Sequence, residues 1–342
     1  MQPPTERIDF EPDRLRDYLR ALLGKAPTEI GIARISGGQS NPTYFVDFGE
    51  RRLVLRKKPA GHILPGAHAI EREFRVIRAL RQTDVPVPDA LVLCEDDGVL
   101  GTPFFLMERL EGRVFSDCAL PGLAPEERRG IYFGLADAMA RLHAVNPADI
   151  GLSDFGKRGN YFERQIGRWS RQYTESSSDR IAALDEIIAW LPENLPRDDG
   201  RISIAHGDFR LGNMLFHPEK PEVIGILDWE LATLGHPLAD LGFSCIPWHS
   251  SPDEYGGILG LDRAALGIPT EAEYVSSYYE CAVPTSPLLP FHVVFALFRF
   301  AVIFYGIADR AKSGTAVSAN AAEIGSLAER FAARALQAIK VA

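Results

Sequence analysis

The pattern of hydrophobic and polar positions changes near residue 108 of this chain of 342 residues. Before that point, short apolar segments bounded by turn residues predict strands, and two amphipathic segments predict helices. The predicted strands are two within Ile30–Phe48, then Arg52–Lys57, Ala90–Leu93 and Phe104–Met107, and the helices are Asp13–Leu23 and His68–Leu80. Helical periodicity then dominates, in Pro125–Ala144, Tyr161–Tyr173, Arg180–Trp190 and Ala319–Lys340. The pattern thus predicts a strand-rich first part and a mainly helical second part.

Two short apolar segments in the second part, Asn213–Phe216 and Val223–Leu227, are separated by a proline-rich turn and predict a β-hairpin. Asp208 stands before the first strand, and Asp228 ends the second. Because a hairpin brings these two ends together, we expect Asp208, Asn213 and Asp228 to converge. Such a group suits phosphoryl transfer, since Asn213 and Asp228 can hold Mg²⁺ through oxygen while Asp208 orients the attacking hydroxyl.

The segment Val293–Ala308 is strongly apolar but shorter than a membrane span requires, and it carries Arg299 in its middle. We interpret it as a buried core helix and expect no membrane association. A buried charge normally needs a partner, so an internal salt bridge is the first expectation for Arg299, and a substrate anchor is the alternative. Aromatic residues are frequent after Gly242, and their helical spacing favours core packing.

Composition excludes some classes of protein and favours others. Lys and Arg number 37 against 46 Asp and Glu, a formal net charge of −9, which argues against non-specific nucleic-acid binding. The four cysteines are far apart and form no CxxC pair, which favours a reduced setting and no zinc site. The N-terminus is charged and has no apolar segment typical of a signal peptide, so we expect a cytoplasmic protein.

A glycine-rich turn, S-G-G-Q-S-N at residues 36–41, lies between the first two predicted strands. Two glycines allow the backbone to approach a phosphate closely, and Ser and Asn add hydrogen-bond donors. A plain hairpin turn is an equally good interpretation of this segment alone. As a nucleotide loop, its candidate phosphate-binding residues are Ser36, Gly37, Gly38 and Ser40.

The hairpin region carries a recognisable motif. His206, Asp208 and Asn213 form H-x-D-x-x-x-x-N (here H-G-D-F-R-L-G-N), and Asp228 follows in D-W-E. This spacing is the protein-kinase signature. With D-W-E in place of D-F-G, the chain from about Ile35 to Asp240 resembles the aminoglycoside phosphotransferase and choline kinase superfamily of small-molecule kinases. The segments S-G-G-Q-S-N-P-T-Y, L-R-K-K-P, L-P-G-A-H and L-D-W-E-L-A-T-L-G-H-P-L-A-D-L-G are similar to the kinase-like domain that animals carry fused to acyl-CoA dehydrogenases.

The resemblance implies a two-lobed α+β fold of the protein-kinase type. A small N-lobe, residues 1–107, would hold an antiparallel sheet with one main helix and bind the nucleotide. A large, mainly helical C-lobe, residues 108–342, would carry the hinge, the catalytic loop and the helices that bind the acceptor. The cofactors would be ATP and Mg²⁺, held in the cleft between the lobes.

The resemblance also implies residues for the nucleotide. In the kinase pattern V-A-I-K, the Lys reaches the phosphates, and alignment of Val54-Leu55-Arg56 places Arg56 there, with Lys57 as the alternative. Arg stays charged and grips phosphate with two donors. The following helix would pair this cation with Glu73, or with Glu71. At the hinge, adenine would be bound by the carbonyl of Glu108 and the amide of Leu110, with Met107 behind the ring.

Catalytic roles follow from the same resemblance. Asp208 would orient and deprotonate the acceptor hydroxyl, and Asn213 and Asp228 would ligate Mg²⁺. Arg210, two residues after Asp208, would neutralise the transferring charge. His206 and His143 would be structural, and Asp240 would accept backbone N–H bonds that hold this loop.

The leading hypothesis is an ATP- and Mg²⁺-dependent kinase that phosphorylates a hydroxyl group of a small acceptor. The resemblance to the dehydrogenase-linked domain suggests a hydroxyacyl compound or its CoA thioester, and a functional link to an acyl-CoA dehydrogenase. Two alternatives stay open: a nucleotide-binding regulatory protein without turnover, and an aminoglycoside- or choline-type kinase. A protein kinase is disfavoured, because the interval from Asp228 to Asp240 is too short for a peptide-docking activation loop and contains no A-P-E.

Overall fold

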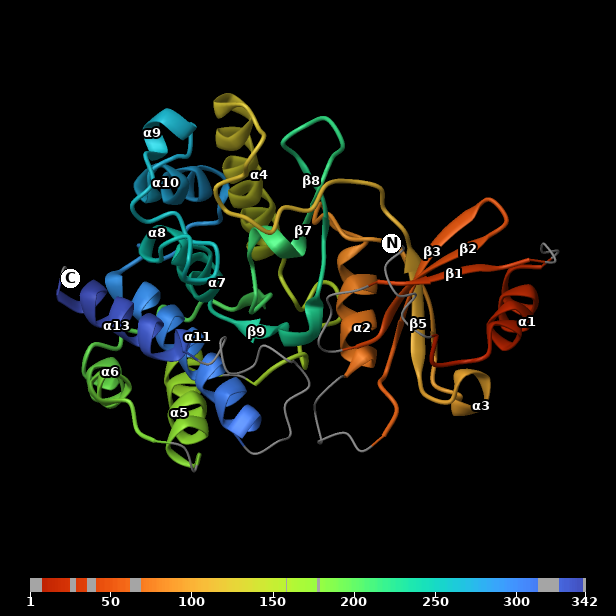
Figure 1. Cartoon of the computed structure of the whole chain (residues 1–342), viewed down its shortest axis with the longest axis horizontal. Helices are drawn as coiled ribbons and strands as arrows, with labels where there is room; N and C mark the ends of the chain where they lie inside the picture. Colours follow the sequence, from red (N-terminus) through yellow and green to blue (C-terminus); the bar gives the residue numbers. More distant parts are fainter. Residues whose placement is uncertain are drawn as a thin grey trace. The chain divides into compact units, whose positions relative to one another are not determined.

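The structure is a computed structural model that describes residues 8–24, 29–35, 41–61, 69–157, 159–176, 179–312 and 326–340. The chain divides into two compact units (Figure 1). The first, here called the N-terminal unit, comprises Met1–Glu111 and Gly225–Glu230, and the second, the helical unit, comprises Gly112–Ile224 and Leu231–Ala342.

A five-stranded antiparallel sheet forms the N-terminal unit. Its strand order is β1-β2-β3-β5-β4, and each neighbouring pair is antiparallel. The strands are β1 (Gly31–Arg34), β2 (Thr43–Phe48), β3 (Arg51–Lys57), β4 (Ala90–Cys94) and β5 (Phe104–Glu108). This confirms the small antiparallel sheet that the resemblance to small-molecule kinases implied.

Helices cover opposite faces of that sheet (Figure 1). On one face, α1 (Pro12–Leu23) inserts Leu15 and Leu19 among side chains such as Tyr44 and Leu55. On the other face, α2 (Ile70–Leu80) places Phe74 against Phe105, with ring centroids 5.9 Å apart. The short helix α3 (Asp97–Leu100) follows β4, and the Asp96 side chain caps it by accepting the Gly98 amide. Because strand residues alternate between faces, this arrangement decides which of them point toward α2.

The helical unit is built around α11 (Pro290–Lys312), which packs against several other helices of the unit, among them α13, α7 and α5. Figure 1 shows α13 beside α11, and α10 beside α4. The remaining bounds are α4 (Pro125–Ala144), α5 (Tyr161–Thr174), α6 (Ala182–Glu193), α7 (Pro237–Ser244), α8 (Ile246–His249), α9 (Arg263–Leu266), α10 (Glu271–Cys281) and α13 (Leu327–Lys340). Strand-rich and helical parts therefore separate as the sequence predicted, which confirms the α+β class.

Two small sheets position the catalytic loop. The predicted hairpin is confirmed as β7 (Met214–Phe216) paired with β8 (Val223–Ile226). A second pair, β6 (Ser203–Ala205) with β9 (Thr233–Gly235), was not predicted. Both strands have only three residues, too few to show an alternating pattern, and they lie 28 or more positions apart. Short 3-10 turns also flank the hairpin, at Leu211–Asn213 and Trp229–Leu231.

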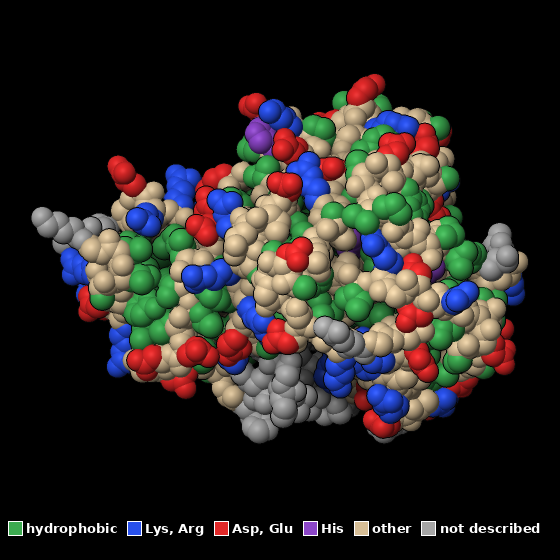
Figure 2. Space-filling view, turned by 180° about the vertical axis from the view of Figure 1, so that it is seen from behind, with side chains coloured by type: hydrophobic (Ala, Val, Ile, Leu, Met, Phe, Trp, Pro, Cys, Tyr) green, Lys and Arg blue, Asp and Glu red, His purple; other side chains and the backbone are tan. Residues whose placement is uncertain are grey.

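Helix α11 is longer than the apolar segment suggested. Residues Pro290–Arg310 are long and apolar enough to cross a membrane by length and composition, but 78% of the tested window is buried inside the protein. Burial of this kind is what a core helix requires, and it supports the interpretation of α11 as one. On the face shown in Figure 2, acidic and basic side chains of the described residues are interspersed rather than gathered by sign.

Candidate active site

The catalytic loop begins directly after β6 and brings three predicted residues together. The amide nitrogen of Asn213 donates to Oδ2 of Asp208 at 2.7 Å and to the Asp208 carbonyl at 2.9 Å. Nε of Arg210 lies 3.2 Å from the same Oδ2. The Asp208 side chain keeps 22% of its surface exposed. A carboxylate that is fixed by two donors but still accessible is suited to accept a proton from a bound hydroxyl.

Asp240, in the first turn of α7, holds the beginning of this loop through hydrogen bonds to its backbone. Its side chain is fully buried and accepts the backbone amides of His206 at 2.6 Å and Gly207 at 2.8 Å. Nε2 of His143 lies 3.3 Å from the same carboxylate, and Nδ1 of His143 is 2.9 Å from the Tyr278 hydroxyl. Burial alone would raise the pKa of Asp240, but these hydrogen bonds lower it below its ordinary value. Asp240 thus stays ionised and fixes the loop.

Gly207 is required at the bend of the loop. Its φ is +84°, and an added Cβ would lie 2.9 Å from the carbonyl oxygen of Leu231. An L side chain would be strained by the backbone conformation and would clash with that carbonyl. Glycine therefore allows the chain to turn sharply just before Asp208.

Arg299 contacts this bend from the middle of α11. Its guanidinium donates a hydrogen bond to the carbonyl of Gly207 and lies over the rings of Phe243 and Trp169, 5.3 and 5.6 Å from their centroids. The expected salt bridge is not formed with any described residue. Aromatic faces and a carbonyl oxygen stabilise the buried charge instead. Arg299 is 6% exposed and therefore positions the catalytic loop from inside the core.

In the N-terminal unit, a cluster of charged residues forms between β3, α2 and the segment after β8. Nε of Arg56 lies 2.6 Å from Oε2 of Glu73, and its Nη2 lies 2.8 Å from Oδ1 of Asp228. The amide of Asn41 donates to Oε1 of Glu73 at 2.9 Å. Burial raises the pKa of Glu73 to about 7, although Arg56 and Asn41 act to lower it. The structure thus brings Arg56, Glu73 and Asp228 together.

The two alternative residues lie elsewhere. Lys57 is 1% exposed on the α1 face of the sheet, and its Nζ lies 3.2 Å from Oδ2 of Asp9. Glu71 pairs with Lys58. Because Arg56 and Lys57 are neighbours on one strand, their side chains point to opposite faces, and only Arg56 faces Glu73.

The predicted hinge residues follow β5. Met107 and Leu110 are half-buried and Glu108 is exposed. Glu108 pairs with Asp89 through its backbone amide, at 2.9 Å from the Asp89 carbonyl. The Leu110 amide has no hydrogen-bond partner among the residues that the structure describes. An unpaired amide at the end of a strand can donate to a ligand, as the predicted adenine site requires. Ser36, Gly37, Gly38 and Ser40 lie outside the described residues.

The predicted magnesium ligands fit a hard cation by their chemistry. The Asn213 amide nitrogen is used by Asp208, which leaves the amide oxygen for a ligand, and Asp228 contributes a carboxylate. Asp228 has a positive φ of +63°, a conformation rare for a residue other than glycine. Among the described residues, no three His, Cys, Asp or Glu side chains form a metal-binding group. Few protein ligands are typical of Mg²⁺ that is shared with nucleotide phosphates.

An apolar pocket of about 340 Å³ lies beside Arg210 within the helical unit. Its aromatic wall comes from α7, α11 and α13 and from the loop after α8. The residues that give it its character are Cys118, Arg210, Phe243, Glu254, Tyr255, Phe300 and Phe331. The guanidinium of Arg210 lies 5.9 Å from the centre of the Tyr255 ring. Because Arg210 also contacts Asp208, this pocket, here called the acceptor pocket, adjoins the catalytic carboxylate.

Comparison with known proteins decides the family. The phosphotransferase enzyme family, APH, matches residues 31–274.

The chain belongs to this family.

Membership confirms the prediction of a phosphotransferase that acts on an alcohol group. A crystal structure of a Ralstonia eutropha protein, assigned provisionally as an aminoglycoside phosphotransferase, is 42% identical and has a TM-score of 0.87, covering 97% of this chain and 98% of that one. An aminoglycoside phosphotransferase bound to AMP-PNP and hygromycin B shares the fold at a TM-score of 0.60 and 16% identity, over 94% of this chain and 98% of that one. These matches confirm the kinase-like fold.

Two curated relatives carry dehydrogenase names. Mouse acyl-CoA dehydrogenase family member 10 is 43% identical over 97% of this chain, and human acyl-CoA dehydrogenase family member 11 is 36% identical over 95%. The chain spans only 31% of the mouse protein and 42% of the human protein. The predicted similarity to a domain associated with acyl-CoA dehydrogenases is confirmed at the level of these names.

Sequence reasoning missed several residues of the site. Tyr255 and Cys118 line the acceptor pocket but lie in irregular segments, where no periodicity marks them. The role of Arg299 was misjudged, because its partner is a backbone carbonyl 92 positions away in the chain. A single charge in a very apolar helix was the only signal that could have identified it.

Proposed function

We propose that this protein is an ATP- and Mg²⁺-dependent kinase that phosphorylates a hydroxyl group on a small acceptor with an apolar body. The observation that carries the proposal is the position of Arg210, which contacts the Asp208 carboxylate and also lines the aromatic acceptor pocket. An acceptor in this pocket would lie beside a carboxylate able to take its hydroxyl proton. A hydroxyacyl compound, free or as its CoA thioester, fits such a pocket.

The charges of the acceptor pocket argue against a polycationic acceptor. Among the residues that the structure describes, its one lining carboxylate is Glu254, and both oxygens of Glu254 are already paired, with Arg330 at 3.1 Å and Arg334 at 2.8 Å. An aminoglycoside needs several free carboxylates, because each ammonium group loses water on binding. The volume of about 340 Å³ is at the lower end for small-molecule sites. It suits an acyl chain, while the rest of a CoA thioester would lie outside.

The residues of the catalytic loop account for the transfer step. Asp208 accepts the proton of the acceptor hydroxyl, whose oxygen forms a bond to the γ-phosphorus of ATP. The bond between that phosphorus and the β,γ-bridging oxygen breaks, and ADP leaves with both electrons. Arg210 would stabilise the negative charge that develops on the phosphoryl oxygens. The products are ADP and a phosphate monoester.

Arg56 and Glu73 are the proposed nucleotide-positioning pair of the N-terminal unit. A paired guanidinium keeps its charge and is held in one orientation by the carboxylate, so it can grip the phosphates with its remaining donors. Asn213 and Asp228 would hold Mg²⁺, which neutralises phosphate charge when bound. Asp228 contacts Arg56 in this structure, so Mg·ATP would compete with that contact.

The acyl-CoA dehydrogenase names of the relatives support a hydroxyacyl acceptor and a functional link to an acyl-CoA dehydrogenase. A dehydrogenase acts on the carbons beside a thioester, and phosphorylation turns a hydroxyl on the same chain into a good leaving group. The two chemistries therefore share one substrate class.

An ADP-release assay with Mg·ATP tests the proposal. The acceptors would be hydroxy fatty acids of increasing length, their CoA thioesters, choline, homoserine and an aminoglycoside. The Asp208→Asn variant serves as blank, and Asp149→Asn, in an exposed loop, serves as the matched control. We expect ADP release only with hydroxyacyl compounds, and only when Asp208 is intact.

Turnover of an aminoglycoside in preference to every hydroxyacyl compound would overturn the proposed acceptor class. The proposed kinase activity would still stand. Binding of Mg·ATP without Asp208-dependent turnover of any acceptor would favour a regulatory protein that binds nucleotide.

A further inference from the structure

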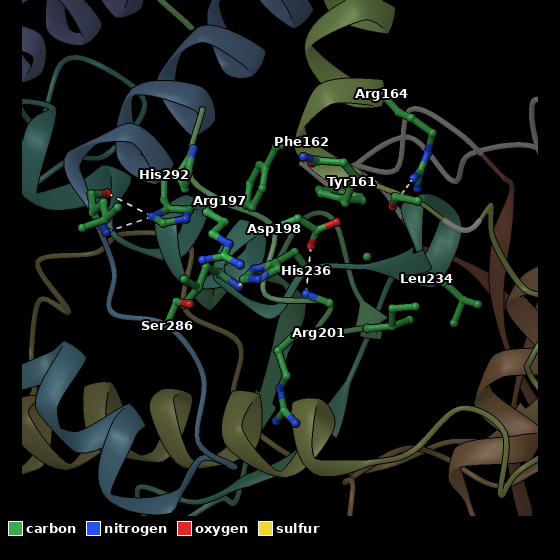
Figure 3. A pocket seen from close by; sticks show the side chains of 18 of the residues that line it. Tyr161, Phe162, Arg164, Arg197, Asp198, Arg201, Leu234, His236, Ser286 and His292 are labelled. Carbon is green, nitrogen blue, oxygen red and sulfur yellow. Dashed lines mark hydrogen bonds between the residues drawn. The ribbon is translucent and has the colours of Figure 1, made fainter. Parts of the chain in front are cut away.

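A second pocket, of about 420 Å³, lies in the helical unit and shares no lining residue with the acceptor pocket. Figure 3 shows it from close by. It lies near Ile202 and Gly235, where β6 begins and β9 ends. Asp208 follows the other end of β6, so the β6–β9 pair separates this pocket from the catalytic carboxylate.

The N-termini of three helices meet at this pocket. Tyr161 and Phe162 begin α5, His236 caps α7, and His292 stands in the first turn of α11. Each helix N-terminus carries a partial positive charge, which favours a bound anion. Three such ends around one cavity give it a positive potential before any side chain is counted.

His292 adds a buried donor that has no partner among the described residues. The residue is 2% exposed. Its Nδ1 lies 2.8 Å from the Leu289 amide nitrogen and 3.2 Å from the Leu289 carbonyl oxygen, and the shorter contact, in which Nδ1 accepts, places the proton on Nε2. Burial lowers the pKa of His292 to about 4, which keeps the ring neutral and this tautomer in place near pH 7. In Figure 3, the ring nitrogen of His292 that makes no hydrogen bond, Nε2, points into the pocket. No described residue accepts its hydrogen bond.

Arg197 supplies a full charge to the same pocket. It lines this pocket together with His292 and His236 (Figure 3). It forms no hydrogen bond or ion pair with any residue that the structure describes. Arg201 also lines the pocket but extends away from the two histidines in this view.

The acidic residues nearby do not neutralise this charge. Asp199 accepts hydrogen bonds from Nε2 of His236 at 3.0 Å and from the Ser286 hydroxyl at 2.8 Å. Burial opposes ionisation, but these bonds and the Arg201 amide hold the pKa of Asp199 well below its usual range. Asp198 is exposed and accepts a backbone amide, that of Gly200. Lys157 and Arg164 line the pocket as well, which leaves a cationic excess.

We propose that this pocket, here called the histidine pocket, is a second ligand site that binds a small molecule with a carboxylate or phosphate group and an apolar body. The anionic group would accept from Nε2 of His292 and from Arg197. The apolar body would contact Tyr161, Phe162 and Leu234. A cationic hollow is unexpected by chance in a chain of net charge −9, and attracts anions selectively.

Binding there would act on the catalytic loop through α7. His236 caps α7 by accepting the Leu238 amide at 3.2 Å, and the same helix carries Asp240, which holds the loop. A ligand that orders this end of α7 would therefore stabilise the loop without contacting Asp208.

Calorimetric titration with two probes, inorganic phosphate and octanoate, tests the site in a buffer free of both anions. We expect saturable binding of at least one probe, which identifies the preferred anionic group. Arg197→Gln should weaken it at least tenfold, because it removes the charge from an exposed position without a packing defect. Arg171→Gln, an exposed arginine of α5 outside the pocket, makes the same charge change and should bind normally. His292→Leu should also lose binding.

The titration with phosphate is repeated with Asp208→Asn and with Tyr255→Ala, and phosphate binding should be unchanged in both. It therefore does not depend on the proposed kinase activity. Saturable binding that Arg197→Gln weakens and these variants keep supports the site. Absence of saturable binding by either probe, equal loss in Arg171→Gln, or loss in Tyr255→Ala would each overturn it, the last because the anion would then lie in the acceptor pocket.

Discussion

The two pockets of the helical unit are of similar size but differ in what their walls offer a ligand. The acceptor pocket is aromatic, and its carboxylate Glu254 is paired. The histidine pocket presents helix N-termini, the buried donor of His292 and the guanidinium of Arg197, which pairs with no residue that the structure describes. By our proposals, the first pocket would select an apolar body next to the Asp208 carboxylate, whereas the second would select an anionic group on the other side of the β6–β9 pair.

This difference shows where specificity lies in such a fold. Residues of the catalytic loop are fixed by the reaction and by the buried Asp240 that holds them. Apart from Arg210 and its two neighbours Leu211 and Gly212, the walls of both pockets come from segments outside the H-x-D-x-x-x-x-N motif. The family motif accordingly predicts the reaction, and the walls decide the ligands.

Asp208→Asn should have the largest effect, because it should slow the reaction beside the acceptor pocket without changing the histidine pocket. Loss of the proton acceptor should reduce turnover by about 10²- to 10⁴-fold. ATP binding and the binding of anions in the histidine pocket should both persist. Steady-state ADP release and calorimetry check this together. Unchanged turnover would remove Asp208 from the mechanism.

Asp228→Ala should weaken Mg²⁺-dependent nucleotide binding by about 100-fold, because a metal ligand contributes several kcal/mol. Neither pocket of the helical unit should change its affinity. Titration of ATP with and without Mg²⁺ measures the effect, and Asp97→Ala, in the short helix α3, is the control. Equal Mg·ATP affinity in wild type and variant would contradict the metal role.

Arg299→Met should lower kcat by about 10- to 100-fold with little change in the acceptor KM. The reason is that a buried, charge-assisted hydrogen bond to the Gly207 carbonyl contributes about 1.5–3 kcal/mol. Arg299→Lys should restore part of the rate, since it retains a donor. A thermal unfolding scan separates loop positioning from global destabilisation. A raised KM with intact kcat would instead make Arg299 a substrate contact.

Tyr255→Ala should raise the acceptor KM about tenfold, because it removes apolar surface from the pocket wall at a cost of about 1–2 kcal/mol. Tyr255→Phe keeps the ring and should behave as wild type. Initial rates over a range of acceptor concentrations give both constants. If Tyr255→Ala leaves KM unchanged, the acceptor lies elsewhere.

The remaining effect concerns the pH dependence of stability rather than activity, and it belongs to the histidine pocket. The pKa of His292 is about 4 in the folded protein and about 6.5 when unfolded, so the unfolded state binds more protons between these values. The free energy of unfolding should fall by up to about 3 kcal/mol as pH decreases from 6.5 to 4. His292→Gln should flatten this slope in urea titrations, whereas His217→Gln, at the hairpin turn, should keep it. An identical slope in His292→Gln would contradict the burial of an uncharged His292.

Short-range patterns in the sequence determined much of this protein. The spacing of Asp208 and Asn213 predicted two residues that the loop does bring into hydrogen-bond contact. Alignment with the kinase pattern placed Arg56 at the phosphate-binding position, and strand alternation turns Arg56 rather than Lys57 toward Glu73. Such predictions hold because strand geometry and local turns depend on neighbouring residues.

Only the tertiary structure decided the partner of Arg299, the pairing of β6 with β9, and the histidine pocket. Gly207 lies 92 positions from Arg299, and the three helix N-termini at the pocket come from α5, α7 and α11. No local periodicity encodes which distant segments meet. The packing of the apolar faces of these helices decides which segments meet. It thereby also decides where the polar groups of the helices lie.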